Sequence, residues 1–240
     1  MKLIEFIKLL IKHKIVLIAV PLLFGLLAIV LTGNPKRSYY SQTILYTGLA
    51  SGSSIEMDKA FNYLATNNAF DNLINIIKSR DTQEEVAVRL LSQHLMLDGP
   101  DKAYISSQAH EDLKEIIPNE LYAYVVKTNL DLGESIYNST SIYDQDYENT
   151  VANLMELMTS DNTNFVYSLL NFDHPYYSLD AISKVKAERI STSDLVKLSY
   201  ETEDPGICQQ TLAIYNEVCI KKYKDLKENG SDAVVKYFEA

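Results

Sequence analysis

The chain has 240 residues, 47 % of them hydrophobic, so it can bury a core of ordinary domain size in addition to an anchor. Its net charge of −10 is unevenly distributed, because residues 1–37 carry six Lys or Arg and one acidic residue, whereas the rest is strongly acidic. An acidic body excludes a typical nucleic-acid-binding protein, since phosphates are bound by Lys and Arg. The basic N-terminal segment suits a membrane surface.

An uncharged run extends from Ile15 to Gly33. As a helix that rises about 1.5 Å per residue, it would nearly cover the ~30 Å hydrocarbon core of a bilayer. Pro21 and Gly25 are tolerated in such helices. The alternatives are a buried core helix and a cleavable signal peptide, but the run is long for the latter and no small-residue cleavage site directly follows it. We therefore expect a transmembrane helix at 15–33.

The basic residues that flank this run indicate its orientation. Three lysines and His13 lie shortly before the run, whereas Lys36 and Arg37 follow it. By the positive-inside rule, this modest contrast predicts a cytoplasmic N-terminus at 1–14 and an extracytoplasmic body. The expected topology is a single pass through the membrane.

The chain after the anchor begins with a strand and continues with helices. Alternation in "YSQTILYT" predicts a strand over 40–47. Apolar residues at helical spacing predict helices at 58–79 and 83–97, the second opened by Thr82 and Glu85 as a capping box. Further helices are expected at 106–117, 119–132 and 146–171.

A second strand is expected in "ERISTSDLVKLSYET", which alternates from Leu195 to Tyr200. It stops at Asp204, which we expect to cap a helix that begins at Pro205. This helix is predicted over 205–228.

The end of the chain is expected to hold a further helix. Asn229 and Gly230 are expected to stop the preceding helix, and Ser231 to open the start of a truncated one at 231–240.

The two predicted strands are far apart in the sequence, and we expect them to meet in one sheet. The expected fold is α+β: an N-terminal transmembrane helix, then a membrane-proximal α/β domain at 34–230 with a large helical insertion at about 58–171.

No arrangement of residues in the sequence indicates catalysis, a cofactor or a metal site. Phosphate-binding glycine loops and nucleophile elbows are absent from the sequence, and the four histidines lack the spacing of zinc ligands. The acidic pairs Glu84-Glu85 and Glu111-Asp112 are interpreted as solvated helix faces. The seventeen tyrosines could stack on sugars, but half-buried packing positions are the simpler interpretation. We therefore expect no enzyme.

The two cysteines lie eleven residues apart on one predicted helix. Their separation would be about 16 Å at the helical rise, whereas a disulfide needs Cα atoms within about 7 Å. Cys208 and Cys219 are therefore expected to be apolar core residues rather than an intrahelical disulfide.

Two stretches of the chain resemble one known family. "IEFIKLLIKHKIVLIAVPLLFGLLAIVL" followed by "SYYSQTILYTG" is similar to the N-terminal part of chain-length determinant proteins, the Wzz-type polysaccharide co-polymerases. "ISTSDLVKLSYETEDPGICQQTLAIYNEVCIKKY" resembles a second element of that family, a strand that ends near Asp-Pro before a helix. The matching positions are Leu195, Val196, Leu198, Tyr200, Asp204, Pro205, Leu212 and Asn216. Between the two stretches, 58–171 match by order and length alone.

The resemblance implies a non-enzymatic component of the bacterial inner (cell) membrane that governs the length of a surface polysaccharide (O-antigen, capsule or exopolysaccharide). Its implied partners are the lipid bilayer, further copies of itself, a polysaccharide polymerase or export machinery, and a lipid-linked glycan. The resemblance also implies a long extended helix and a second membrane helix, neither of which we recognise in this sequence. We expect either a fragment or a single-span variant. The competing hypotheses are a membrane-anchored extracytoplasmic binding or sensor module and, with least support, an anchored hydrolase.

Overall fold

The structure is a computed structural model that describes residues 11–32, 37–48, 59–128, 136–172 and 174–238. The chain forms two compact units, Met1–Arg37 and Ser38–Ala240, which are taken separately below. The mixed helical and sheet architecture expected from the sequence is confirmed.

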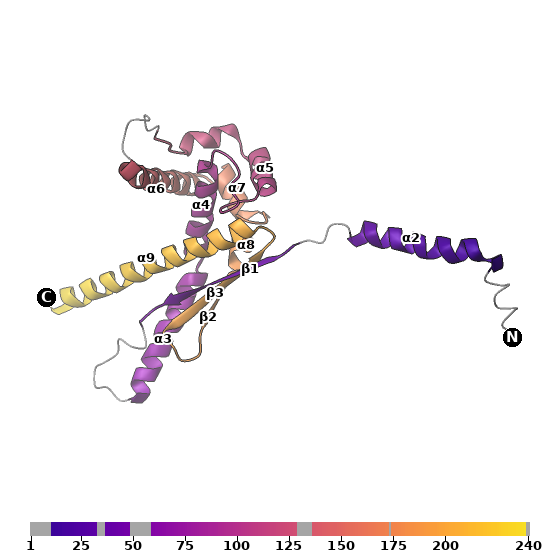
Figure 1. Cartoon of the computed structure of the whole chain (residues 1–240). Helices are drawn as coiled ribbons and strands as arrows, with labels where there is room; N and C mark the ends of the chain where they lie inside the picture. Colours follow the sequence, from indigo (N-terminus) through magenta and orange to yellow (C-terminus); the bar gives the residue numbers. More distant parts are fainter. Residues whose placement is uncertain (1–10, 33–36, 49–58, 129–135, 173, 239–240) are drawn as a thin grey trace. The chain divides into compact units, whose positions relative to one another are not determined.

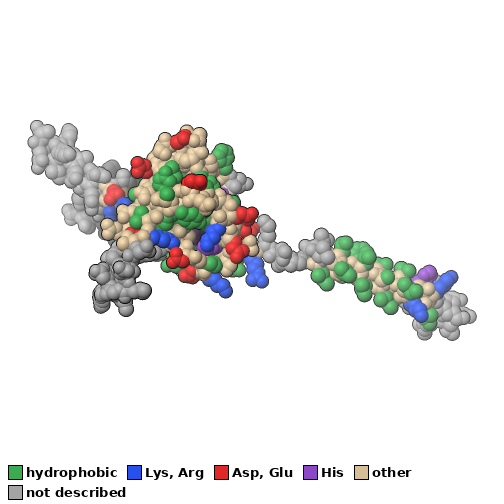
Figure 2. All heavy atoms as spheres, turned by 90° about the horizontal axis from the view of Figure 1, so that it is seen from above, with side chains coloured by type: hydrophobic (Ala, Val, Ile, Leu, Met, Phe, Trp, Pro, Cys, Tyr) green, Lys and Arg blue, Asp and Glu red, His purple; other side chains and the backbone are tan. Residues whose placement is uncertain are grey.

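The first unit contains helix α2 (Lys14–Thr32), with Pro21 inside it. Large apolar side chains are exposed all around it, for example Ile15 at 75 % and Ile29 at 71 %. Figure 2 shows this hydrophobic surface, with Lys and His side chains gathered at the N-terminal end of the helix. Within the described residues, no helix combines the length and the apolar content needed to cross a membrane. Gly33, the last residue of the expected span, lies outside the described residues.

The second unit combines one small sheet with several helices (Figure 1). Its elements in chain order are β1 (Tyr39–Tyr46), α3 (Lys59–Lys78), α4 (Arg80–Met96), α5 (Ser107–Ile116), η1 (Asn119–Tyr124), α6 (Ile136–Ser160), α7 (Phe165–Asn171), α8 (Leu179–Ser183), β2 (Lys186–Arg189), β3 (Leu195–Thr202) and α9 (Pro205–Phe238).

The sheet has the order β1-β3-β2, and both pairings are antiparallel. β1 pairs with β3 along its whole length, from Tyr39 opposite Thr202 to Tyr46 opposite Leu195. The predicted meeting of these two strands is therefore confirmed. Side chains alternate along β1, so that Leu45 is buried whereas its neighbours Ile44 and Tyr46 are exposed. Helix α9 packs on β1 and β3, and it brings the last part of the chain back onto its beginning.

Helix α4 lies at the centre of the second unit. It contacts α3, α6, α8 and α9. Figure 1 shows α5, α6 and α7 around one end of α4, and α3 with the sheet toward the other. Seven consecutive residues, 86–92, are buried, so this helix is surrounded rather than amphipathic. The Ser92 hydroxyl donates to the Val88 carbonyl, 2.8 Å away, which satisfies a polar group in this buried stretch.

The start of α4 differs from the sequence-based prediction. The N-cap is Ser79, whose Oγ accepts from the backbone N–H of Thr82, and the helix begins at Arg80. The predicted capping box of Thr82 and Glu85 is therefore wrong. Ser79, three residues earlier, is the cap because its extended backbone lets its Oγ reach the free N–H groups of the first turn.

Two further helix predictions are corrected in the middle of the chain. The helix expected at 119–132 is a short 3₁₀ turn, η1, after which Val125 is extended. The helix expected at 146–171 consists of α6, which begins already at Ile136, and α7, which Asn164 caps through its side-chain oxygen.

The C-terminal third holds elements that the sequence did not predict. Helix α8 and strand β2 lie within 173–189, a polar stretch in which no helix or strand was expected. The sheet therefore has a third strand. Helix α9 continues through Asn229, Gly230 and Ser231 to Phe238, so the predicted stop and the separate helix at 231–240 are wrong. A glycine in a helix costs only about 1 kcal/mol relative to alanine, which a long helix can absorb.

Candidate functional site

The turn from β3 into α9 is built around Asp204. Its Oδ1 accepts from the N–H of Ile207 at 3.0 Å, which confirms the predicted N-cap. Its Oδ2 accepts from the N–H of Ser106 at 2.9 Å, so the same buried carboxylate also holds the segment that leads into α5. This junction therefore joins α9 to the helical part of the unit.

Gly206 allows the start of α9 to lie close to the backbone of residues 104–105. A Cβ placed on Gly206 would lie 2.7 Å from the Tyr104 carbonyl carbon, 2.8 Å from its oxygen and 2.9 Å from the Ile105 nitrogen. Real Cβ atoms do not approach backbone this closely, so only glycine fits between the start of α9 and residues 104–105. Sequence reasoning identified the aspartate but missed the role of this glycine, because the contact joins distant segments.

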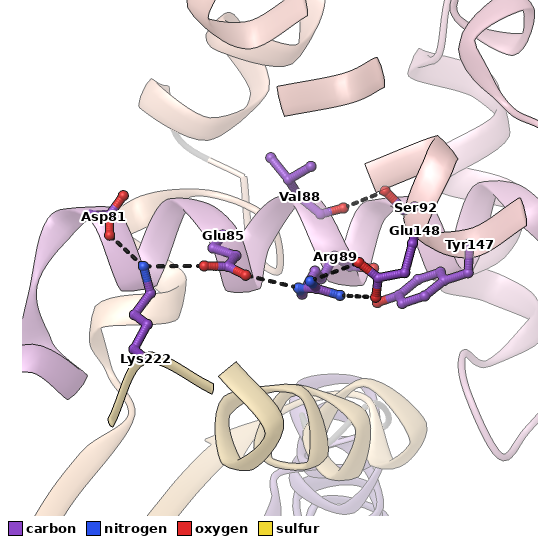
Figure 3. Close-up of polar contacts among 8 residues, drawn as sticks. All are labelled: Asp81, Glu85, Val88, Arg89, Ser92, Tyr147, Glu148 and Lys222. Atoms are coloured by element: carbon purple, nitrogen blue, oxygen red, sulfur yellow. Dashed lines mark hydrogen bonds and ion pairs between the residues drawn. The ribbon is translucent and has the colours of Figure 1, made fainter. Parts of the chain in front are cut away.

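A row of alternating charges runs along α4 and joins it to α6 and α9 (Figure 3). We call it the charged seam. It consists of Asp81, Glu85 and Arg89 on α4, Glu148 on α6 and Lys222 on α9.

Arg89 is the most buried member of the charged seam. It binds both Glu148 oxygens, at 2.7 and 3.1 Å, and Glu85 at 3.1 Å. The bidentate contact to Glu148 matches the fork geometry of a guanidinium. Tyr147 lies against Arg89 and donates its hydroxyl to the Arg89 carbonyl at 3.1 Å. The arginine thus fixes α6 to α4.

Neighbouring charges in the seam shift the pKa values of Arg89 and Glu148 so that the charged forms are favoured. Burial works to lower the pKa of Arg89, but hydrogen bonds and attraction from Glu148 and Glu85 outweigh it and raise this pKa. The hydrogen bond from Arg89 holds the pKa of Glu148 below its ordinary value. At the other end, Lys222 binds Asp81 and, at 3.1 Å, Glu85. Arg89 and Glu148 are therefore both charged near neutral pH.

A hollow of about 420 Å³ opens beside the charged seam, between α4, α6 and α9. Its walls carry two tyrosines, two glutamine amides and three carboxylates. They are Tyr104, Tyr147, Gln93, Gln210, Asp144, Glu148 and Glu217. Aromatic faces and hydrogen-bonding groups of this kind suit a hydroxyl-bearing ligand such as a sugar.

His94 is a buried histidine whose two ring nitrogens both have partners. Nδ1 lies 2.6 Å from the Tyr177 hydroxyl, and Nε2 lies 3.2 Å from the Tyr104 carbonyl oxygen. Because a carbonyl can only accept, Nε2 carries the proton and Nδ1 accepts from Tyr177. Burial lowers the pKa of His94 to about 4. His94 thus links α4 to Tyr177 and to the Tyr104 carbonyl.

Because of His94, the free energy of unfolding is expected to decrease as the pH is lowered from 7 to 4. The unfolded chain takes up the imidazole proton near pH 6.5, whereas the folded protein does so only near pH 4. Between these values the unfolded state binds more protons, so the free energy of unfolding falls as the pH is lowered, by about 3 kcal/mol in all. Denaturant unfolding of the wild type and of His94→Gln from pH 7 to 4 checks this. Equal pH slopes in the two proteins would contradict it, and His13→Gln controls for the loss of one histidine.

Other residues singled out in the sequence are placed as follows. Cys208 and Cys219 are free and buried, as predicted, and burial raises the pKa of both thiols, that of Cys219 to about 12. Glu111 and Asp112 are exposed on α5, as predicted. The prediction for Glu85 is wrong, because its side chain is only 16 % exposed and belongs to the charged seam.

The positions that carried the second resemblance serve the core and the cap. Val196, Leu198, Tyr200 and Leu212 are buried in the core. Asn216 is partly buried, and its Oδ1 is enclosed without a hydrogen-bond partner among the described atoms. Within the described part of the chain, no three His, Cys, Asp or Glu side chains gather in a way that could hold a metal ion.

Comparison with known proteins gives one finding. Residues 1–90 match the family model described as Wzz, chain length determinant protein. This segment contains α2, β1, α3 and the first two-thirds of α4. Neither the curated proteins nor the solved structures include a significant match. The resemblance inferred from the N-terminal residues is thus confirmed: residues 1–90 are similar to the N-terminal region of Wzz-type chain length determinant proteins.

Proposed function

We propose that this protein is a membrane-anchored, non-enzymatic subunit that determines chain length in the biosynthesis or export of a surface polysaccharide, such as O-antigen, capsule or exopolysaccharide. The observation that carries the proposal is the family match over residues 1–90. The fold adds support, because β1, inside the match, pairs along its whole length with β3, far beyond it. The part of the matched region that begins at Ser38 is therefore integral to the fold of the second unit.

The proposed anchor is α2 together with the residues that flank it. Its exposed Ile, Leu, Val and Phe side chains would be costly in water, whereas a bilayer would solvate them. Lysines near its N-terminal end favour a cytoplasmic N-terminus. In this proposal the chain crosses the inner membrane once, and the unit that begins at Ser38 lies outside the cytoplasm.

The proposed partners are further copies of the same chain, a polysaccharide polymerase or export machinery, and a lipid-linked glycan. The acidic body argues against nucleic acid. The proposed role requires no cofactor, since the family acts by regulating a polymerase and not by catalysis.

Loss of the gene is expected to change the polysaccharide itself. In a deletion strain, the surface and released polysaccharide should shift from a narrow length distribution to a broad ladder on a gel. Expression of the 240-residue chain should restore the narrow distribution. An unchanged distribution, in a strain checked for paralogues, would contradict the proposal.

The hollow beside the charged seam supports a second candidate, an anchored binding or sensor module. Its tyrosines and carboxylates could hold a sugar without any control of glycan length. The two candidates differ in assembly: a chain-length determinant is expected to form homo-oligomers in detergent, whereas the binding module is expected to be a monomer with measurable glycan affinity. Light scattering of the purified full chain separates them.

A further inference from the structure

A second hollow, of about 260 Å³, lies where the C-terminal end of α4, helix α5, η1 and the segment after η1 meet. It is separate from the charged seam and from the hollow beside it, with which it shares no lining residue. Its polar lining includes His110 and Lys114 of α5, Lys127 after η1, and Asp98 after α4.

His110 is the unusual member of this second hollow. The residue is only 3 % exposed, yet none of the hydrogen bonds among the described residues involves its ring. By contrast, both ring nitrogens of His94, which also lines the hollow, are satisfied. Among the described residues, the side-chain nitrogen and oxygen atoms that are both fully enclosed and without a hydrogen-bond partner belong to Gln93 and Asn216. The ring nitrogens of His110 are not among them, so they retain some accessible surface. The nitrogen-bearing edge of His110 is therefore not sealed in the core but reaches the hollow.

The charges around His110 favour a negative ligand. Lys114 lies one helical turn further along α5, on the same face as His110. The single carboxylate in the lining, Asp98, is already bound by Lys127 at 2.8 Å. The titratable groups around His110 are His94 and Asp98 from α4 and its following turn, Glu111 and Lys114 from α5, Tyr122 from η1, and Lys127.

We propose that this hollow binds one anionic oxygen group, a carboxylate or a phosphate, held between His110 and Lys114 with Lys127 at the rim. An imidazole and an ammonium group both donate hydrogen bonds to such an anion. A metal ion does not fit, because the described residues hold no cluster of three suitable ligands. The proposal rests on this geometry alone and is independent of the proposed role in chain-length determination.

Binding is expected to take up a proton. Burial, and after it the nearby Lys114, lowers the pKa of His110, so its ring is neutral in the empty hollow at pH 7. An anion at hydrogen-bond distance favours the imidazolium and raises this pKa by about 1 unit or more. The affinity for glucuronate, whose carboxylate stays ionised over this range, should therefore increase as the pH falls from 7.5 to 5.5.

The test uses the full chain in a neutral detergent with ¹³C-labelled histidine. The His110 ring signal is assigned by its loss in His110→Gln. Its pKa is then measured by NMR with sodium chloride, inorganic phosphate, glucuronate or neutral glucose, at constant ionic strength. Phosphate or glucuronate should raise the pKa of His110 and chloride and glucose should not. Whether phosphate, glucuronate or both act identifies the source of the anionic group.

Two lysine variants make the test specific. Lys114→Gln should weaken binding about tenfold, since it removes one charge from the hollow. Lys102→Gln removes the same charge from an exposed site that does not line the hollow, and should leave binding unchanged. No anion-dependent shift of His110, an equal shift with glucose, or equal weakening by the two lysine variants would overturn the proposal. Because wild-type His110 is the probe, the result does not depend on His110→Gln folding well.

Discussion

Replacement of Gly206 by alanine is expected to destabilise the second unit by about 3 kcal/mol, at the upper end for the insertion of one methyl group into close-packed surroundings. The new Cβ would meet the backbone of Tyr104 and Ile105 at 2.7–2.9 Å, and backbone cannot rotate away as a flexible side chain can. Relief requires α9 or the 104–105 segment to move, which strains the Asp204 hydrogen bonds to Ile207 and Ser106. Denaturant unfolding of the full chain in detergent measures the loss.

The chain provides a matched control for this steric effect. A Cβ added at Gly99 would meet no atom within 4 Å, and the φ of Gly99 is not in the left-handed region. Gly99→Ala should change the free energy of unfolding by less than about 0.5 kcal/mol. If Gly206→Ala were as mild as Gly99→Ala, the close approach of α9 to residues 104–105 would be wrong.

Replacement of Arg89 by methionine is expected to cost about 3 kcal/mol, near the lower end for a broken buried ion pair. Glu148 would lose both of its guanidinium hydrogen bonds, and Glu85 would keep Lys222 as its partner. The cost stays near the lower end because the Glu148 side chain is 52 % exposed and water can hydrate it. Methionine keeps most of the length of the stem, so the charge and hydrogen bonds, more than packing, account for the change.

Arg80→Met is the matched control on the same helix. Arg80 also pairs with a glutamate four residues on, at 2.7 Å, but its side chain is 63 % exposed. An exposed pair of this kind contributes less than about 1 kcal/mol, so the variant should unfold close to the wild type. Equal losses for the two arginine variants would show that burial of Arg89 does not set its importance.

The sequence predicted best those elements whose signals lie in adjacent residues and whose positions agree with the tertiary fold. Alternation predicted β1 and β3, and Asp204-Pro205 predicted the start of α9, because cap and strand signals depend on adjacent residues. The prediction that Thr82 caps α4 failed because serine and threonine are both good caps, and only the backbone geometry shows that Ser79 is used. Strand β2 was missed because its four residues, Lys186–Arg189, are mostly polar and gain their pairing from β3.

The candidate site was harder to predict than the fold. The charged seam joins residues of α4, α6 and α9 that no sequence spacing brings together, apart from the i,i+4 pair of Glu85 and Arg89. Gly230 was taken as a helix stop, but α9 runs through it, since neighbouring helical residues outweigh the local cost of one glycine. The burial of α4 on all sides also hid the seam, because an arginine within an apolar run gives no periodic signal.

The central claim is that the folded second unit sets polysaccharide length. The most direct measurement is the length distribution of the polysaccharide in a deletion strain that is complemented with the wild type, Arg80→Met or Arg89→Met. The three chains should be expressed equally, and polysaccharide from cells grown at rising temperature compared on one gel. We predict that the wild type and Arg80→Met restore the same narrow distribution throughout, whereas Arg89→Met loses it at a lower temperature, as its folded fraction falls. A deletion strain whose polysaccharide keeps its length distribution without any of the three chains would contradict the claim.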